Sequence, residues 1–173
     1  MPKKLPKIVV DTATLISLVH GNILELALSE FEFLISNWII EELNNTAKYK
    51  DIDAEAARAV LKQKKRLKII RIKKAELEKF LSRRIDLGEA SCIAIAGKEK
   101  VDTLISDDFK AIPELKYWSK KFGFDLGLCA ILIKALVLKG KLNKEKAKKI
   151  FDRIGRKRGW IGRPIYDYGK KIL

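Results

Sequence analysis

The chain has 173 residues, 47% of them hydrophobic, which is enough for one domain with a sizeable core and excludes a disordered polymer. Its 37 Lys and Arg residues against 22 Asp and Glu residues give a formal net charge of +15. A surface this positive attracts polyanions, of which nucleic acid is the commonest. The composition leaves one alternative open, the charged surface of a heat-stable protein.

Short apolar runs rich in β-branched and aromatic residues predict four buried strands, at residues 7–10, 31–35, 67–72 and 103–106. Helical patterns separate these runs. One covers residues 53–66, and another covers residues 74–85, with Leu77, Phe80, Leu81 and Ile85 on one face. Strands that alternate with helices predict an α/β fold with a mostly parallel sheet, covered on both faces.

The chain is predicted to be helical after Pro113, and Asn143 is predicted to cap a helix over residues 143–156. No linker, repeat or low-complexity segment divides the chain. We therefore predict a single domain over residues 1–173, in which residues 123–173 form a helical C-terminal extension.

Cys92 and Cys129 lie inside apolar stretches without the spacing of a zinc site, which predicts buried thiols in a reducing compartment. The longest apolar stretch, residues 126–138, is too short to span a bilayer and contains Lys134. The sequence shows no signal-peptide pattern. We expect a soluble, cytoplasmic protein with no membrane partner.

Carboxylates follow two of the predicted strands. Asp11 comes directly after Ile8-Val9-Val10, and Asp107 and Asp108 come after residues 103–106. Because ligands bind beyond the carboxyl ends of parallel strands, these acids are candidates for one site. Each also has a purely structural explanation, since Asp caps helices and is common in turns.

Two further acids align with apolar helical faces. Glu89 lies in line with Cys92 and Ile93, and Glu42 precedes Leu43. The structural alternatives are a favourable helix dipole at Glu89 and a solvent-facing flank at Glu42. Clustered carboxylates repel one another unless a cation neutralises them, and Mg²⁺ and Mn²⁺ prefer such oxygen ligands. A basic protein with an acidic metal pocket is typical of a nuclease.

Two basic clusters supply candidate RNA-binding residues, namely Lys64, Lys65, Arg66, Arg156 and Arg158. Trp160, Tyr166 and Tyr168 lie near the second cluster and either stack on unpaired bases or pack the terminal helix. We favour packing for Trp160 and Tyr166. His20, the one histidine, is interpreted as a helix-terminal residue because no positioned partner is evident.

Four sequence blocks, VVDTATLISL, EEL, GEASCIAIA and LISDDFKA, in this order and spacing resemble the PIN-domain ribonucleases, which include the VapC-type toxins. The likeness covers about residues 7–112. Residues 123–173 further resemble the C-terminal half of a prokaryotic PIN subgroup. The resemblance implies a three-layer α/β/α fold with a central parallel sheet and a metal-dependent endoribonuclease site that uses Mg²⁺ or Mn²⁺.

The resemblance carries the catalytic roles onto Asp11, Glu42, Glu89 and Asp108, and the metal ligands onto Asp11, Glu89, Asp107 and Asp108, without separating the last two. It implies RNA as substrate, and an antitoxin and a homodimer as partners. Many members carry Ser or Asn where this chain has Ala13. In this chain Thr12, Thr14 or Ser106 would supply the hydroxyl group that faces the site.

The main alternative is an RNA-binding PIN-like module whose metal site has degenerated. The presence of acids at all four motif positions favours catalysis over this alternative. A phosphatase of the haloacid-dehalogenase type is excluded because its DxDxT motif meets Ala13 and Leu15 here. No Walker A or GxGxxG motif is present.

Overall fold

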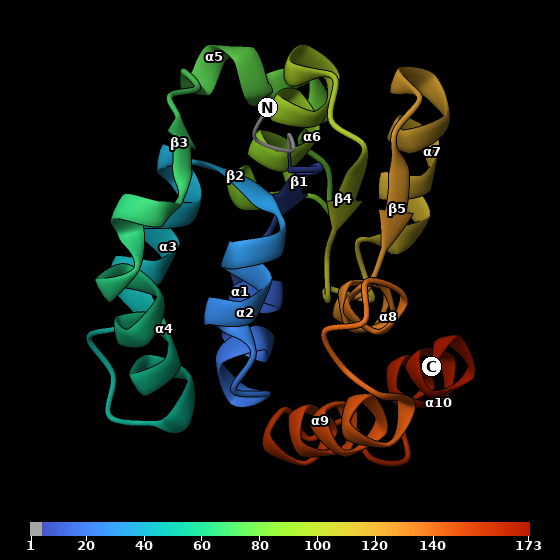
Figure 1. The fold of residues 1–173 in the computed structure, drawn as a ribbon. Coiled ribbons are helices and arrows are strands. Elements are labelled where there is room, and N and C mark those ends of the chain that lie inside the picture. The colour runs from blue at the N-terminus through green and yellow to red at the C-terminus, as the bar shows by residue number, and fades with distance from the viewer. Residues whose placement is uncertain (1–4) are drawn as a thin grey trace.

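The computed structural model describes residues 5–173 and contains one sheet of five parallel strands in the order β3-β2-β1-β4-β5 (Figure 1). The strands are β1 (Lys7–Val10), β2 (Glu32–Ser36), β3 (Lys68–Ile70), β4 (Thr103–Ile105) and β5 (Asp125–Gly127). Four of them confirm the predicted strands, with shifts of one or two residues at their ends. The fifth was not predicted.

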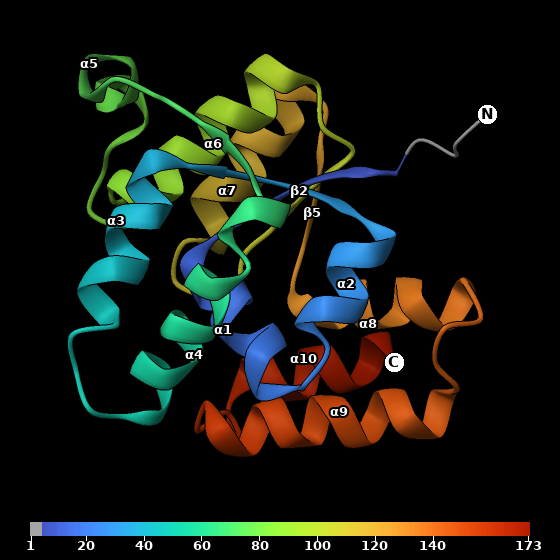
Figure 2. The same ribbon diagram turned by 60° about the vertical axis from the view of Figure 1, so that its left-hand side comes forward.

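Helices cover both faces of this sheet. They are α1 (Thr12–His20), α2 (Leu24–Glu30), α3 (Asn37–Thr46), α4 (Ile52–Lys62), α5 (Lys74–Leu77), α6 (Leu87–Glu99), α7 (Ile112–Phe122), α8 (Cys129–Leu138), α9 (Lys144–Lys157) and α10 (Pro164–Ile172), with 3₁₀ turns η1 (Lys64–Arg66) and η2 (Glu78–Phe80). Figure 2 shows α6 and α7 on one side of the sheet and α1, α2 and α8 on the other. This is the three-layer α/β/α fold that the sequence predicts.

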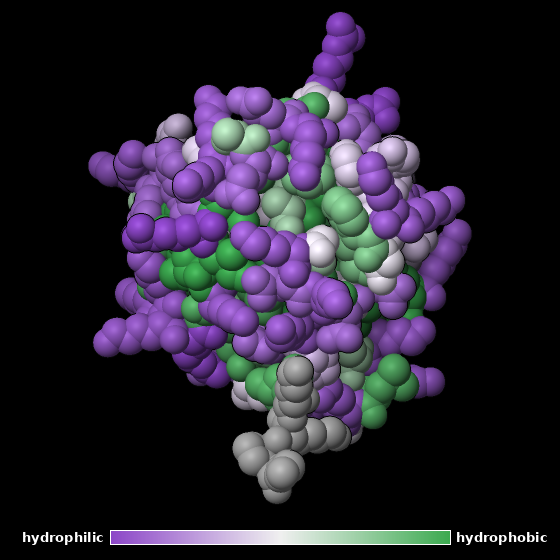
Figure 3. Space-filling view, turned by 90° about the horizontal axis from the view of Figure 1, so that it is seen from above, coloured by the Kyte–Doolittle hydropathy of each residue, from purple (hydrophilic) through white to green (hydrophobic). Residues whose placement is uncertain are grey.

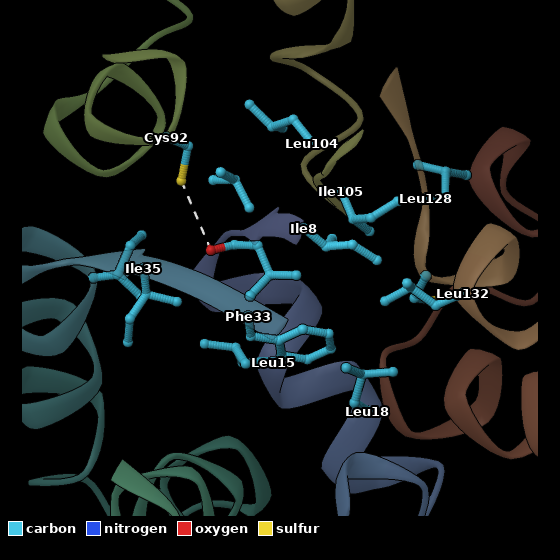
Figure 4. Packing of buried hydrophobic residues seen from close by; sticks show 14 of the residues in the cluster. Ile8, Leu15, Leu18, Phe33, Ile35, Cys92, Leu104, Ile105, Leu128 and Leu132 are labelled. Atoms are coloured by element: carbon cyan, nitrogen blue, oxygen red, sulfur yellow. Dashed lines mark hydrogen bonds between the residues drawn. The ribbon is translucent and has the colours of Figure 1, made fainter. Parts of the chain in front are cut away.

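The central strands are apolar because they are buried on both faces, as parallel strands under helices usually are. Val9, Phe33 and Leu104 have no exposed surface. In Figure 4, Leu15 of α1 lies below the sheet, and Cys92 of α6 lies above it with its thiol directed at the carbonyl of Val10. Both cysteines are buried free thiols, as predicted.

Strand β5 corrects the expectation that the chain is helical throughout after Pro113. Its sequence, Asp125-Leu126-Gly127, lacks β-branched residues, so propensity alone does not indicate a strand. Pairing with β4 determines its conformation, with Ile105 opposite Gly127. A side chain at Gly127 would overlap Ile131 of α8, so the glycine permits this close packing.

The helix predicted over residues 74–85 is much shorter, because a serine side chain ends it. α5 and η2 stop at Phe80, and the Ser82 hydroxyl then accepts hydrogen bonds from the backbone N–H groups of Arg84 and Ile85. Leu81, which the helical pattern placed on the buried face, is 38% exposed. The result is a fixed turn between α5 and α6 (Figure 2).

The C-terminal helices pack onto α8 and α1, at the lower right of Figure 1. Asn143 caps α9 by accepting the N–H of Lys146, as predicted. Trp160 is buried against Phe151, and Tyr166 stacks on the same ring with centroids 5.7 Å apart. These two aromatic rings therefore pack the terminal helices, whereas Tyr168 is exposed.

The face seen in Figure 3 is mostly hydrophilic, and hydrophobic atoms show only in small areas between long polar side chains. Across residues 5–173, no single helix combines the length and apolar character needed to cross a membrane.

Candidate active site

Asp11 lies where β1 ends and α1 begins. Its Oδ1 accepts the N–H of Thr14 at 2.7 Å, which caps α1, and its Oδ2 accepts the hydroxyl of Ser106. The register of the sheet explains the second contact, because Val10 pairs with Ile105 and the next residues of both strands become neighbours. Asp11 is 4% exposed. It is thus a helix cap, and its second oxygen lies at the carboxyl edge of the sheet.

The end of β4 brings Asp107 and Asp108 to the same edge. Asp107 is buried, and its Oδ1 accepts the N–H of Cys129, the first residue of α8, at 2.9 Å. Its Oδ2 is also buried and has no hydrogen-bond partner among the described residues. Asp108 is half-buried, and its Oδ1 accepts the N–H of Lys110 at 2.9 Å. The two aspartates therefore have different environments, which the sequence did not reveal.

Glu42 comes from α3 and crosses to the start of α1, where it accepts a hydrogen bond from the Thr12 hydroxyl. Glu41 is exposed, while Glu42 is half-buried. The carboxylate lies against Gly88 of α6, where a Cβ would come within 2.7 Å of its Cδ and 2.8 Å of its Oε2. Any residue other than glycine at position 88 would therefore displace the Glu42 carboxylate.

Glu89 forms a capping box at the start of α6. Its Oε2 accepts the N–H of Asp86 at 2.9 Å, and the Asp86 carboxylate accepts the N–H of Glu89 at 3.0 Å. The helix-terminal role that the sequence left open is therefore real. The same side chain also lines a cleft at the carboxyl edge of the sheet.

A cleft of about 380 Å³ opens at this edge of the sheet, and all five predicted acids line it. The acids are Asp11, Glu42, Glu89, Asp107 and Asp108. They come from the ends of β1 and β4 and from two helices, so residues 97 positions apart in the sequence (108 − 11) meet in one place. Thr12 and Ser106, two of the three hydroxyl residues proposed to replace the one missing at Ala13, hydrogen-bond to these carboxylates.

A family model, DUF3368, described as a PIN domain, matches residues 7–171. This chain belongs to the PIN-domain family. The match includes the whole sheet and the C-terminal helices as well as the five acids. PIN domains are generally nucleases and generally use divalent metal ions. No curated protein matches the chain.

Burial and mutual repulsion raise the pKa values of four of the acids in the cleft of this PIN domain. Burial, followed by the charge of Asp107, raises the pKa of Asp11 to about 6. Burial raises the pKa of Glu42 to about 7. The pKa values of Glu89 and Asp107 are also raised, in both cases chiefly by burial. Without a cation, the cleft therefore resists full ionisation near neutral pH.

A second network in the cleft was not predicted. The Nε2 atom of His20 lies 2.7 Å from one oxygen of Asp53, and Arg158 donates from Nη1 to the other oxygen at 2.7 Å. The positive charge of Arg158 lowers the pKa of Asp107, although burial outweighs it. His20 is a helix-terminal residue, as predicted, yet its ring is buried and paired. His20 and Asp53 are 33 positions apart in the sequence, and Asp53 and Arg158 are 105 positions apart, so no local sequence pattern relates them.

Only part of the predicted RNA-binding set lies near the cleft. Arg158 lines it, and Arg156 is exposed on the last turn of the same helix. Lys64, Lys65 and Arg66 form η1, which leads into the amino end of β3 and so lies at the opposite edge of the sheet. The structure does not bring these three residues to the acids.

The carboxylates fit a divalent cation in donor chemistry, but they are not closed around one. Among residues 5–173, no three His, Cys, Asp or Glu side chains stand close enough together to hold a metal ion. Asp107 nevertheless offers a buried oxygen without a partner, and its charge raises the pKa of Asp11. Both features favour a cation, which would require the carboxylates to draw together.

We expect Mg²⁺ or Mn²⁺ to raise the Tm of this protein, measured by scanning calorimetry. At ten times the dissociation constant, binding to the folded state alone adds about 1.4 kcal/mol, or about 3–6 °C. The rise should be smaller at about pH 6 than at about pH 8, because protons compete for Asp11 and Glu42 at the lower pH. An equal rise in Asp11→Asn protein would place the bound cation elsewhere.

Proposed function

We propose that this protein is a Mg²⁺- or Mn²⁺-dependent endoribonuclease. The observation that carries the proposal is the convergence of five carboxylates in one cleft of a chain with a net charge of +15. The basic surface attracts the RNA backbone, and the acidic cleft concentrates a cation at one place on it. Membership of the PIN-domain family supports nuclease activity, and the resemblance to PIN-domain ribonucleases supports RNA as substrate.

In this proposal Asp11, Glu89, Asp107 and Asp108 hold the cation. When bound, such an ion stabilises the charge that develops on a phosphodiester and lowers the pKa of water. Ser106 orients Asp11 by donating its hydroxyl to Oδ2, so the carboxylate does not turn freely.

Glu42 lines the cleft beside the acids that hold the cation in this proposal, and it is placed to act as a general base. Its pKa is about 7 in the cation-free cleft, and a group whose pKa is near the working pH exchanges protons most effectively. Its carboxylate takes the proton of the attacking water, and the Thr12 hydroxyl keeps that carboxylate in place. Arg158, paired with Asp53, contributes a fixed positive charge that binds the phosphate group.

The test is the cleavage of a mixed pool of labelled single-stranded and structured RNAs, with Mg²⁺, Mn²⁺ or EDTA, beside DNA of the same sequences. We expect cleavage of RNA that EDTA abolishes and that either ion restores. Salt-sensitive RNA binding without cleavage would instead support the alternative, an RNA-binding module with a degenerate metal site.

The role in the cell is a further part of the proposal, and it rests on the resemblance to VapC-type toxins. A toxin of this kind would act in the cytoplasm, as a homodimer, and would be covered by a cognate antitoxin. Expression of the wild-type chain in a bacterial host would then arrest growth, and expression of the Asp11→Asn variant would not.

A further inference from the structure

A second hollow, of about 520 Å³, adjoins the acidic cleft and shares Glu89 and Asp108 with it. The residues that line it are Ser82, Arg83, Arg84, Asp86, Glu89, Asp108, Phe109, Lys110 and Pro113. Three of these side chains are cationic and three are acidic, and the three acids include the two shared with the acidic cleft. We call the hollow the basic groove after its cations, Arg83, Arg84 and Lys110. A bound polymer that leaves the acidic cleft on the side of Glu89 and Asp108 enters the basic groove.

One wall of the basic groove is the turn that follows η2 and contains Ser82, Arg83 and Arg84. The Ser82 hydroxyl accepts N–H groups from Arg84 at 3.1 Å and from Ile85 at 3.2 Å, and it donates to Glu114 of α7. Ile85 is 1% exposed, which anchors the turn in the core. Arg83 and Arg84 are therefore presented from a fixed backbone rather than from a loose loop.

The turn that follows Asp108 also lines the basic groove. The Asp108 carboxylate accepts the N–H of Lys110, and its carbonyl accepts the N–H of Ala111, which has no exposed surface. This turn presents Phe109, whose side chain is 42% exposed, beside an acid of the cleft. An exposed aromatic ring among cations, next to a candidate active site, suits a nucleobase better than water.

The three cations of the basic groove form no salt bridge with the acids that line it, Asp86, Glu89 and Asp108. None of the ion pairs formed by residues 5–173 involves Arg83, Arg84 or Lys110, and all three side chains are exposed. Arg158, on the other side of the acids, is by contrast paired with Asp53. The charges of Arg83, Arg84 and Lys110 lie where the phosphate backbone of a nucleic acid bound in the acidic cleft would continue.

We propose that the basic groove binds the unpaired RNA nucleotides next to the phosphodiester that is cleaved, with one base on Phe109 and phosphates on Arg83 and Arg84. This rests on the proposed function. An unpaired strand is the occupant because the bases of a duplex already stack on one another and leave none for the ring. The groove thus makes the protein selective for single-stranded RNA.

The test is RNA binding by the full chain in EDTA, so that cleavage does not interfere, measured by fluorescence anisotropy on labelled oligouridylate of about 12 nucleotides. We expect Arg83→Ala/Arg84→Ala to weaken binding about tenfold and to reduce the slope of log K against log salt by about 1.4. Phe109→Ala should weaken binding about fivefold or more, whereas Phe109→Trp, which keeps an aromatic ring, should bind like the wild type.

Lys146→Ala/Lys148→Ala is the matched control, since it removes the same charge from exposed positions of α9 that line neither the acidic cleft nor the basic groove. We expect it to change binding less than about twofold. A hairpin duplex of similar length should bind wild type and Phe109→Ala equally. Thermal melts of each variant confirm that the fold is intact, and Arg83→Lys/Arg84→Lys should retain most of the affinity.

Equal losses from both double variants, or none from the groove variants, would overturn the proposal. The same holds if Phe109→Ala weakens duplex binding as much as single-strand binding. If the wild type cleaves RNA while the groove variants bind normally, only this inference fails. If the wild type never cleaves but the groove variants lose single-strand binding, the groove stands and the nuclease proposal fails.

Discussion

Asp11→Asn is expected to lower RNA cleavage by about 100-fold or more while making the metal-free protein more stable. The loss of cleavage follows from the position of Asp11, which is shared by the acidic cleft, the start of α1 and the hydroxyl of Ser106. Asparagine keeps the capping oxygen and the shape of the side chain but removes the negative charge. The measurement is the single-turnover rate on an RNA that the wild type cleaves.

The gain in stability follows from the raised pKa of Asp11. Below about pH 4, Asp11 is protonated in both the folded and the unfolded chain, so its charge makes no difference. As the pH rises towards the folded pKa of about 6, the unfolded chain releases the proton and the folded chain does not, so folding becomes less favourable. The full penalty, about 1–3 kcal/mol, is present above that pKa. Asparagine should therefore raise the Tm by several degrees at about pH 8 and hardly at pH 4.

Asp51→Asn is the matched control. Asp51 also caps a helix, accepting the N–H of Ala54 at 2.8 Å, but it is exposed and does not line the acidic cleft. We expect it to change neither the cleavage rate nor the dependence of Tm on pH. Cleavage by Asp11→Asn at the wild-type rate would refute the proposed site, and a lower Tm at pH 8 would refute the electrostatic explanation.

The fold was largely predictable because its signals are local. Apolar runs such as Ile8-Val9-Val10 remain strands in the structure, and Asn143 caps the helix that its position predicts. The predictions were wrong where contacts between residues distant in the sequence determine the secondary structure. Strand β5 depends on its pairing with β4, and the helix after Lys74 ends at a turn that Ser82 stabilises through Glu114.

The acids of the candidate site were predictable for a related reason. Parallel strands end at one edge of the sheet, so Asp11 and Asp107 were expected at that edge, and the pairing of β1 with β4 makes them neighbours there. The pairing of His20 and Arg158 with Asp53 was not predictable, because no sheet register or helical spacing relates these positions. Nor was the position of Arg83 and Arg84 on a turn, since the periodicity placed them inside a helix that ends at Phe80 in the structure.

The structural and functional explanations of these acids are not alternatives. Asp11, Glu89 and Asp107 each use one carboxylate oxygen to accept a backbone N–H at the start of α1, α6 or α8. Three helix N-termini therefore point at one cleft, and their positive ends offset part of the repulsion between the acids. Each carboxylate keeps an oxygen that the cap does not use, and for Asp107 this oxygen has no partner among the described residues.

Gly88→Ala is expected to reduce cleavage on the order of 100-fold without removing any charge, because it displaces the Glu42 carboxylate by about 1 Å. The new methyl group would overlap that carboxylate, which lies 2.7 Å away at Cδ. The fold should survive, since a flexible side chain can move and alanine favours a helix over glycine by about 1 kcal/mol. The measurement is the cleavage rate beside the Tm, and Glu42→Gln should show a loss of similar size.

Gly97→Ala provides the control on the same helix. It lies in the last turns of α6, where a Cβ would approach the Phe122 ring to 3.1 Å and would not touch the acids. Some stability is expected to be lost there, with the cleavage rate unchanged at a temperature where the protein stays folded. If Gly88→Ala cleaves like the wild type while Glu42→Gln is inactive, Glu42 acts from a position other than the one against Gly88. If both variants are active, Glu42 is not the base, and the proton must pass to another acid of the cleft.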